Sequence, residues 1–126
     1  MDRGAPYSWL SQVILIPSLV SRSCLLFNSS LTAHLSDKCQ SIPARAYGTF
    51  YQGHKGYLSG ANILDVATIG IDLSLLTSNT SLITDAYARV HEEVVIHAGV
   101  MVDGIKPDGS FGQHRGLLYN GNYGKV

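Results

Sequence analysis

Residues 61–77 read ANILDVATIGIDLSLLT, and this stretch decides the fold class. Small and apolar residues recur in it at steps of three and four, the spacing that places side chains on one face of a helix. The residues on that face are Ile63, Val66, Ala67, Gly70, Ile71, Ser74 and Leu75. We therefore predict a helix over 61–77 that turns this face toward a core.

A second helix is predicted directly after the first. Asn79 or Thr80 can cap it, because both residue types favour the position that precedes a helix. It runs to about Ala98, and its apolar stripe consists of Leu82, Ala86, Val90 and Val94, with Ile83 and Tyr87 beside it. Two helices joined by so short a turn form an antiparallel hairpin.

The N-terminal third also reads as helical. Residues 9–27 are dominated by apolar side chains, with Arg22 as their only charge, which indicates a buried helix or a pair of helical segments. Pro17 interrupts the apolar run, which at about 12 residues is too short to span a bilayer. A signal peptide is not favoured, because no clear small-residue cleavage site follows.

A shorter helix is expected over residues 31–41, where Leu31, Leu35 and Cys39 share one face. Pro43 is expected to close it. Residues 46–59 then read as a loop rich in glycine and aromatic residues. Its aromatic side chains suit either stacking on sugar rings or fixing the loop to the core, and we weight the two alternatives evenly. The chain as a whole predicts an all-α fold of stacked helical hairpins.

Composition excludes several classes of function. Nine basic and nine acidic residues give a formal net charge of zero, and charged residues make up only 14% of the chain. No basic tract indicates binding to nucleic acid, and no segment indicates a membrane span. Cys24 and Cys39 are too few for a disulfide framework or a zinc site of cysteines alone. A single disulfide between Cys24 and Cys39 and a pair of free thiols are equally open alternatives.

The residues that carry chemistry lie near the end of the chain. Residues 108–114 read DGSFGQH and residues 119–124 read YNGNYG. His114 and Tyr123 are nine positions apart, so on one uninterrupted helix they would point to opposite faces. They can share a site only if the chain turns between them, which Gly121 and Gly124 allow. A polar, glycine-rich surface loop is the alternative.

Three segments together resemble the catalytic domain of polysaccharide lyase family 8, the hyaluronate, chondroitin AC and xanthan lyases. Residues 108–114 and 119–124 match the family's DGSF-x-QH and Y-x-G-x-YG pattern, and residues 59–62, SGAN, are similar to its TGAN. Residues 8–10, SWL, with Ile14 and Pro17, look like its NWW…IG-x-P helix start. Ser8 and Leu10 depart from that start, which weakens the aromatic platform for a sugar; Ser59 in place of threonine is a minor change.

The resemblance implies a β-elimination next to a uronic acid. Asn62 is the family's asparagine, and its amide would hold the uronate carboxylate so that negative charge can develop there. His114 would take the proton α to that carboxylate, and Tyr123 would protonate the leaving glycosidic oxygen. Tyrosine acting as both base and acid is the alternative. No metal or other cofactor is implied.

Three further residues are candidates for substrate binding. Trp9 stands in the aromatic position of the helix start, and stacking on a sugar and packing in the core are equally open for it. Gln113 and Tyr119 flank the catalytic pair and are candidates for lining the cleft. For these two residues, packing within the loop is the preferred alternative.

The resemblance also implies an architecture. Residues 1–126 would be the C-terminal part of an incomplete lyase catalytic domain, a truncated (α/α) toroid of antiparallel helical hairpins without the family's β-sandwich domains. The enzyme would act on an acidic polysaccharide outside the cell. Two alternatives stay open: a catalytically inactive helical fragment with at most weak glycan binding, and a generic helical interaction module.

Overall fold

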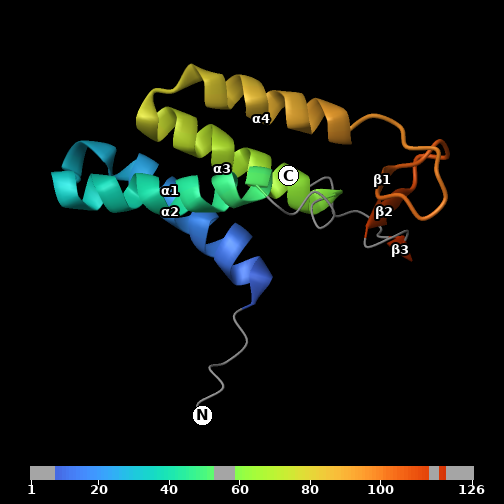
Figure 1. Ribbon diagram of the computed structural model, residues 1–126, viewed down its shortest axis with the longest axis horizontal. Coiled ribbons are helices and arrows are strands. Elements are labelled where there is room, and N and C mark those ends of the chain that lie inside the picture. Colours follow the sequence, from blue (N-terminus) through green and yellow to red (C-terminus); the bar gives the residue numbers. More distant parts are fainter. Residues whose placement is uncertain (1–7, 53–58, 114–116, 119–126) are drawn as a thin grey trace, which may run out of the picture.

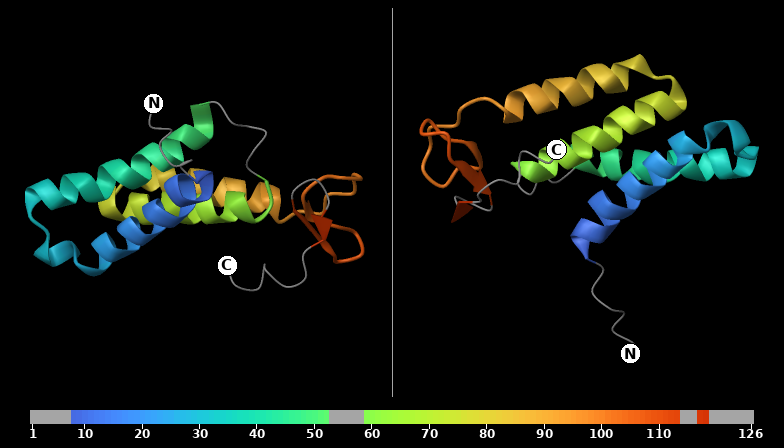
Figure 2. Two further views of the ribbon diagram at one scale, coloured as in Figure 1. Left: turned by 90° about the horizontal axis from the view of Figure 1, so that it is seen from below. Right: turned by 180° about the vertical axis from the view of Figure 1, so that it is seen from behind.

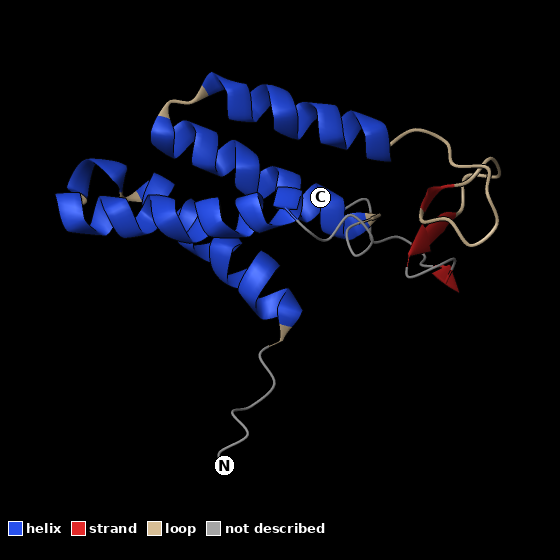
Figure 3. Cartoon of the chain, viewed as in Figure 1, coloured by secondary structure: helices blue, strands red, loops and turns tan. Residues whose placement is uncertain are grey.

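The structure is a computed structural model, and it describes residues 8–52, 59–113 and 117–118. Helices dominate this part of the chain, and three short strands form a small sheet at one end (Figures 1 and 3). The helices are α1 (Ile16–Leu26), α2 (Ala33–Gln52), α3 (Ala61–Thr77) and α4 (Thr80–Glu93), with a π-helical turn, η1 (Ser11–Leu15), before α1 and a 3₁₀ turn, η2 (Asn28–Ser30), after it. The strands are β1 (Gly104–Ile105), β2 (Phe111–Gln113) and β3 (Leu117–Leu118). The predicted all-α class is confirmed.

Helix α3 is the centre of the fold. It packs against α1, α2, α4 and η1, and its ends coincide with the predicted range. Leu64, Ile69 and Leu73 are buried although they lie off the predicted face. Because other helices pack against α3 on several sides, more than one of its faces is buried. Its apolar residues therefore lie nearly all around the helix instead of forming one stripe.

Helices α3 and α4 form the predicted antiparallel hairpin (Figures 1 and 2). Asn79 caps α4: its side-chain Oδ1 accepts a hydrogen bond from the Ser81 N–H at 3.1 Å. The prediction that α4 reaches Ala98 was wrong, because α4 ends at Glu93. The β-branched residues that follow favour extended backbone, and the His97 N–H donates to the Ile105 carbonyl at 2.7 Å.

Helices α1 and α2 form a second hairpin, and a disulfide between Cys24 and Cys39 links them. The prediction that Pro43 closes a short helix was wrong, because α2 continues through it to Gln52. Proline in a helix interior removes one hydrogen bond and costs about 3 kcal/mol. Here the disulfide at Cys39 and the buried Tyr47 fix α2 to its neighbours on both sides of Pro43, and tertiary packing outweighs that cost.

The first half of the expected loop at 46–59 is therefore the end of α2. Tyr47 is buried in a core cluster with Ile14 and Val66, and its hydroxyl donates a hydrogen bond to Asp85 on α4. For Tyr47 the structure selects packing over sugar stacking. The other aromatic residues of that segment lie outside the described side chains.

The small sheet closes the end of the molecule where α3 begins and α4 ends (Figures 1 and 2). Its order is β1-β2-β3, with both pairs antiparallel; Gly104 pairs with Gly112, and Gly112 with Leu118. Strands of two or three residues are too short to show an alternating pattern, which is why the sequence did not reveal them. Within the described ranges, no helix is long and apolar enough to cross a membrane.

Candidate functional site

Residues 106–110 form the turn of the hairpin that joins β1 to β2, and the Gly109 N–H donates to the Lys106 carbonyl at 2.9 Å. The Asp108 carboxylate accepts a hydrogen bond from the Ser110 N–H at 2.9 Å. Hydrogen bonds from the Ser110 side chain and, after it, from this N–H lower the pKa of Asp108. Gly109 has φ +78°, a conformation that side chains disfavour. Asp108, Gly109 and Ser110 thus lie in a tight turn that directs β2 back toward α3.

The start of α3 is held by side chains from three other parts of the chain. The Gly60 N–H donates to Glu93 Oε1 at 2.7 Å, and the Ala61 N–H donates to Gln113 Oε1 at 2.8 Å. The Ser59 hydroxyl donates to Asp103. We call Glu93, Asp103 and Gln113 the clamp; Glu93 and Gln113 bind backbone, and Asp103 binds the Ser59 hydroxyl.

Gly60 makes this entry into the helix possible. Its φ of 61° and ψ of −134° lie in a region that is essentially restricted to glycine. Gly104 approaches from the sheet side: a Cβ added there would lie 2.5 Å from Cδ2 of His97 and 3.3 Å from Oε1 of Glu93. Gly60 and Gly104 therefore let the backbone come close to the carboxylate of Glu93.

Glu93 is that carboxylate, and it is 7% exposed. Burial raises the pKa of Glu93, while the hydrogen bond from Gly60 and the nearby His97 oppose the rise, and Asp103 adds to it. Nε2 of His97 is buried without a hydrogen-bond partner among the described residues. This end of the molecule is thus polar and tightly packed behind the start of α3.

Asn62 is the second residue of α3 and is partly exposed. It directly follows Ala61, whose N–H contacts Gln113, so the structure brings Asn62 close to the residue that precedes His114. The sequence separation of Ala61 and Gln113 is 52, and only the fold brings them together. His114, Tyr119 and Tyr123 lie outside the described residues, and their predicted roles stay predictions.

The two other predicted binding residues lie within the described part. Trp9 precedes η1, and the residue is 39% exposed. Gln113 is buried, and both ends of its carboxamide contact backbone: Oε1 accepts from Ala61, and Nε2 donates to the Ser59 carbonyl at 3.2 Å. These contacts favour the packing alternative for Gln113.

Sequence reasoning missed Glu93 and Asp103. Neither belongs to a recognisable local pattern: Glu93 ends a helix, and Asp103 stands in the connection to β1. The one sequence feature that pointed to Glu93 was its acidic side chain next to Val94, the last residue of the predicted apolar stripe. Among the described residues, no group of three or more His, Cys, Asp or Glu side chains is arranged to hold a metal ion.

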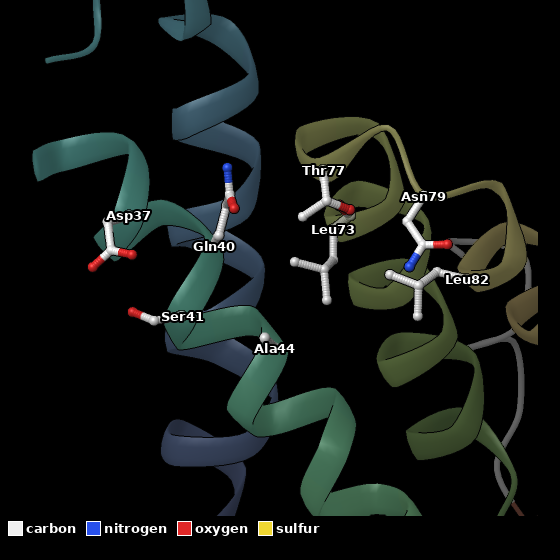
Figure 4. A pocket seen from close by; sticks show the side chains of 8 residues that line it. All are labelled: Asp37, Gln40, Ser41, Ala44, Leu73, Thr77, Asn79 and Leu82. Atoms are coloured by element: carbon white, nitrogen blue, oxygen red, sulfur yellow. The ribbon is translucent and has the colours of Figure 1, made fainter. Parts of the chain in front are cut away.

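A groove of about 350 Å³ lies at the opposite end of α3 (Figure 4). Asp37, Gln40, Ser41 and Ala44 of α2 line one side. The other side comes from Leu73 and Thr77 of α3, Asn79 of the turn and Leu82 of α4. Because Thr77 is the last residue of α3 and Asn62 the second, this groove is separate from the candidate site.

The geometry defines a domain of helical hairpins whose small sheet closes over the start of its central helix. The N-terminal alpha-helical domain of polysaccharide lyase family 8 matches residues 24–126. The chain belongs to this family.

Individual relatives agree with that assignment. The chain is 27% identical over 127 residues to hyaluronate lyase HylB of Enterococcus faecalis, covering 98% of this chain and 12% of that protein. Its fold is similar to that of the Streptomyces coelicolor A3 chondroitin AC lyase, solved in complex with chondroitin sulphate, with a TM-score of 0.81 and 22% identity over 94% of this chain and 16% of that one. The Paenibacillus xanthan lyase gives a TM-score of 0.72 and 22% identity over 93% of this chain and 10% of that one. The chain thus spans a small part of each relative's length.

Proposed function

We propose that this chain carries the reacting side chains of a polysaccharide lyase that cleaves uronic-acid-containing glycans of the hyaluronan or chondroitin kind. The observation that carries the proposal is the contact of Gln113 with Ser59 and Ala61. It joins the segment that ends in Asn62 to the segment that continues into His114. Two parts of the family's pattern, more than fifty positions apart, therefore meet at one place.

The chemistry follows from the acidity of the substrate. The proton α to a uronate carboxylate is weakly acidic while that carboxylate keeps its full charge. A hydrogen bond from the Asn62 amide would stabilise the negative charge that develops on the carboxylate as the proton leaves. Because the amide is neutral, it binds the ground-state anion less tightly than an arginine would, which favours the transition state.

His114 would accept the proton as the C–H bond breaks. The electron pair of that bond then forms the new carbon–carbon double bond, and the glycosidic C–O bond breaks. Tyr123 would donate its phenolic proton to the departing oxygen. The products are an unsaturated uronate and a new sugar hydroxyl, and the elimination consumes no water. General acid–base catalysis of this kind contributes about 10²–10⁴-fold in rate.

Ultraviolet absorbance of the unsaturated uronate tests the proposal. The protein is incubated with hyaluronan and with chondroitin, and product formation is expected with at least one of them. His114→Ala should abolish product, whereas His34→Ala, which changes an exposed histidine of α2, should not. If folded protein forms no product from any uronate polymer, the lyase activity is not a property of this chain.

That outcome would support an inactive helical part with at most weak glycan binding. The observation that favours this second candidate is the coverage of only 10–16% of the solved lyases. Titration with hyaluronan oligosaccharides, followed by the fluorescence of Trp9, would detect such binding, since Trp9 is the single tryptophan.

We further infer that residues 1–126 form the C-terminal part of a helical (α/α) toroid. The support is apolar surface of a kind that neighbouring helices cover: Leu19 is 68% exposed and Leu26 82%. We also infer an extracellular location. The Cys24–Cys39 disulfide supports it, because disulfides persist in oxidising compartments.

A further inference from the structure

The start of α3 lacks a cap of its own. The residue at the capping position is Gly60, which has no side chain, and no side-chain hydrogen bond from that position closes the first turn. Helix N-termini leave N–H groups that need acceptors, usually from a serine, threonine or aspartate at that position. Here the acceptors at Gly60 and Ala61 come from Glu93 and Gln113, which are distant in sequence.

Gln113 makes the more specific of these contacts. Its carboxamide binds the backbone at two points, accepting from Ala61 and donating to Ser59. A two-point contact fixes both the position and the direction of the peptide segment, whereas a single hydrogen bond leaves it free to rotate. Because Gln113 is 7% exposed, the contact is shielded from competing water.

We propose that Gln113 is a positioning residue: it holds the first turn of α3 so that the Asn62 amide meets the uronate carboxylate in the orientation that the transition state requires. Glu93 and Asp103 complete the same clamp. This inference rests on the proposed function and deepens it, by assigning a role to a buried side chain that does not touch the substrate.

The magnitude of the effect follows from how Asn62 would act. Its hydrogen bond strengthens as charge moves onto the carboxylate, so misplacing it lowers kcat rather than raising KM. A displacement of about 1 Å can cost about 10²-fold in rate. For Gln113→Ala we expect kcat to fall about 10- to 100-fold and KM to change less than about threefold.

Two variants control for other effects. Gln113→Met keeps the length of the side chain but loses both hydrogen bonds, so its kcat should fall about as far as that of Gln113→Ala. Gln40→Ala removes a glutamine that lines the distant groove and should leave kcat unchanged. Circular dichroism of each variant verifies that the helices remain folded.

A double-mutant cycle separates positioning from a direct role. If Gln113 acts through Asn62, then Gln113→Ala in an Asn62→Ala background costs nothing more in kcat, because the group it positions is already gone. Additive losses in kcat, or a rise in KM alone, would overturn the proposal. The second result would instead mean that Gln113 binds the substrate.

Amide hydrogen exchange tests the clamp without relying on activity. The Ala61 N–H should be protected in the wild type and exchange at least tenfold faster in Gln113→Ala, and the side-chain amide resonances of Asn62 should shift. Unchanged exchange and unchanged resonances would refute the clamp even in an active enzyme. An inactive wild type with a protected Ala61 amide would instead refute the proposed function and leave the clamp standing.

Discussion

The ring of Tyr47 on α2 lies directly against the backbone of Gly70 on α3. A Cβ built on Gly70 would fall 2.4 Å from Cε2 of that ring, a distance that real side chains do not show. Glycine at this position lets α2 and α3 approach closely, and Tyr47 fills the space that the missing side chain leaves. The hydroxyl of the same ring then reaches Asp85 on α4, so one residue ties three helices together.

The first prediction concerns this contact. Gly70→Ala should lower the free energy of unfolding by about 1–2 kcal/mol, because overpacking against a buried ring outweighs the gain in helix propensity. Gly48→Ala is the matched control: Gly48 is also inside a helix, and its Cβ would meet nothing within 4 Å. That variant should be stabilised by about 0.5–1 kcal/mol. Urea unfolding measures both, and equal effects would contradict the packing argument.

The second prediction concerns alkaline pH. Burial and, after it, the hydrogen bond to Asp85 raise the pKa of Tyr47 above its ordinary value near 10. The unfolded chain therefore releases this proton at lower pH than the folded chain. The stabilising contribution is complete below about pH 10 and is lost as pH rises further.

Tyr47→Phe should remove this part of the alkaline loss of stability. At neutral pH the same variant should cost about 1 kcal/mol, because Asp85 loses one hydrogen bond and keeps its contact with Arg89. Urea unfolding at a series of pH values measures both effects. Tyr87→Phe, at a position 61% exposed, should change stability by less than about 0.5 kcal/mol at neutral pH.

The third prediction concerns the disulfide. Cys24 and Cys39 are 15 positions apart, and closing a loop of that size restricts the unfolded chain enough to contribute about 3 kcal/mol. Reduction should therefore lower the melting temperature. A variant with both cysteines changed to alanine should start from the lower value and be insensitive to the reductant. A melting temperature that reductant leaves unaltered in the wild type would show that the bridge contributes little.

The fourth prediction concerns the cap of α4. Asn79→Ala removes the acceptor of the Ser81 N–H and should cost about 1 kcal/mol in thermal or urea unfolding. Asn79→Asp keeps a side-chain oxygen at the same place and should cost much less. Should both variants lose the same stability, some interaction other than the cap would be responsible.

The sequence predicted the central helices well, because their apolar residues follow a regular spacing over many residues. The range 61–77 was correct for that reason. Of the two capping residues that the sequence left open, Asn79 and Thr80, the structure selects Asn79. Pro43 misled the prediction, because proline locally favours the end of a helix. In the structure, the packing of Cys39 and Tyr47 outweighs this local preference. Such an effect depends on residues that only the fold brings near.

The candidate site was predictable only in part. Asn62 was named as a candidate because it lies in a short pattern similar to one of a known family. Glu93 and Asp103 could not, because their significance depends on distance in space to Gly60 and Ser59 rather than on neighbouring residues. Gln113 was named as a candidate for lining the cleft with packing as the preferred alternative, and its contacts with Ala61 and Ser59 favour packing.

The small sheet reaches α3 through contacts between residues 52 and 54 positions apart. An element at the end of a domain can open locally while the rest of the domain stays folded. Warming or mild denaturant should therefore release β2 from α3 before the helical body melts. The lyase chemistry proposed for this chain would then disappear at conditions where its circular dichroism still looks native.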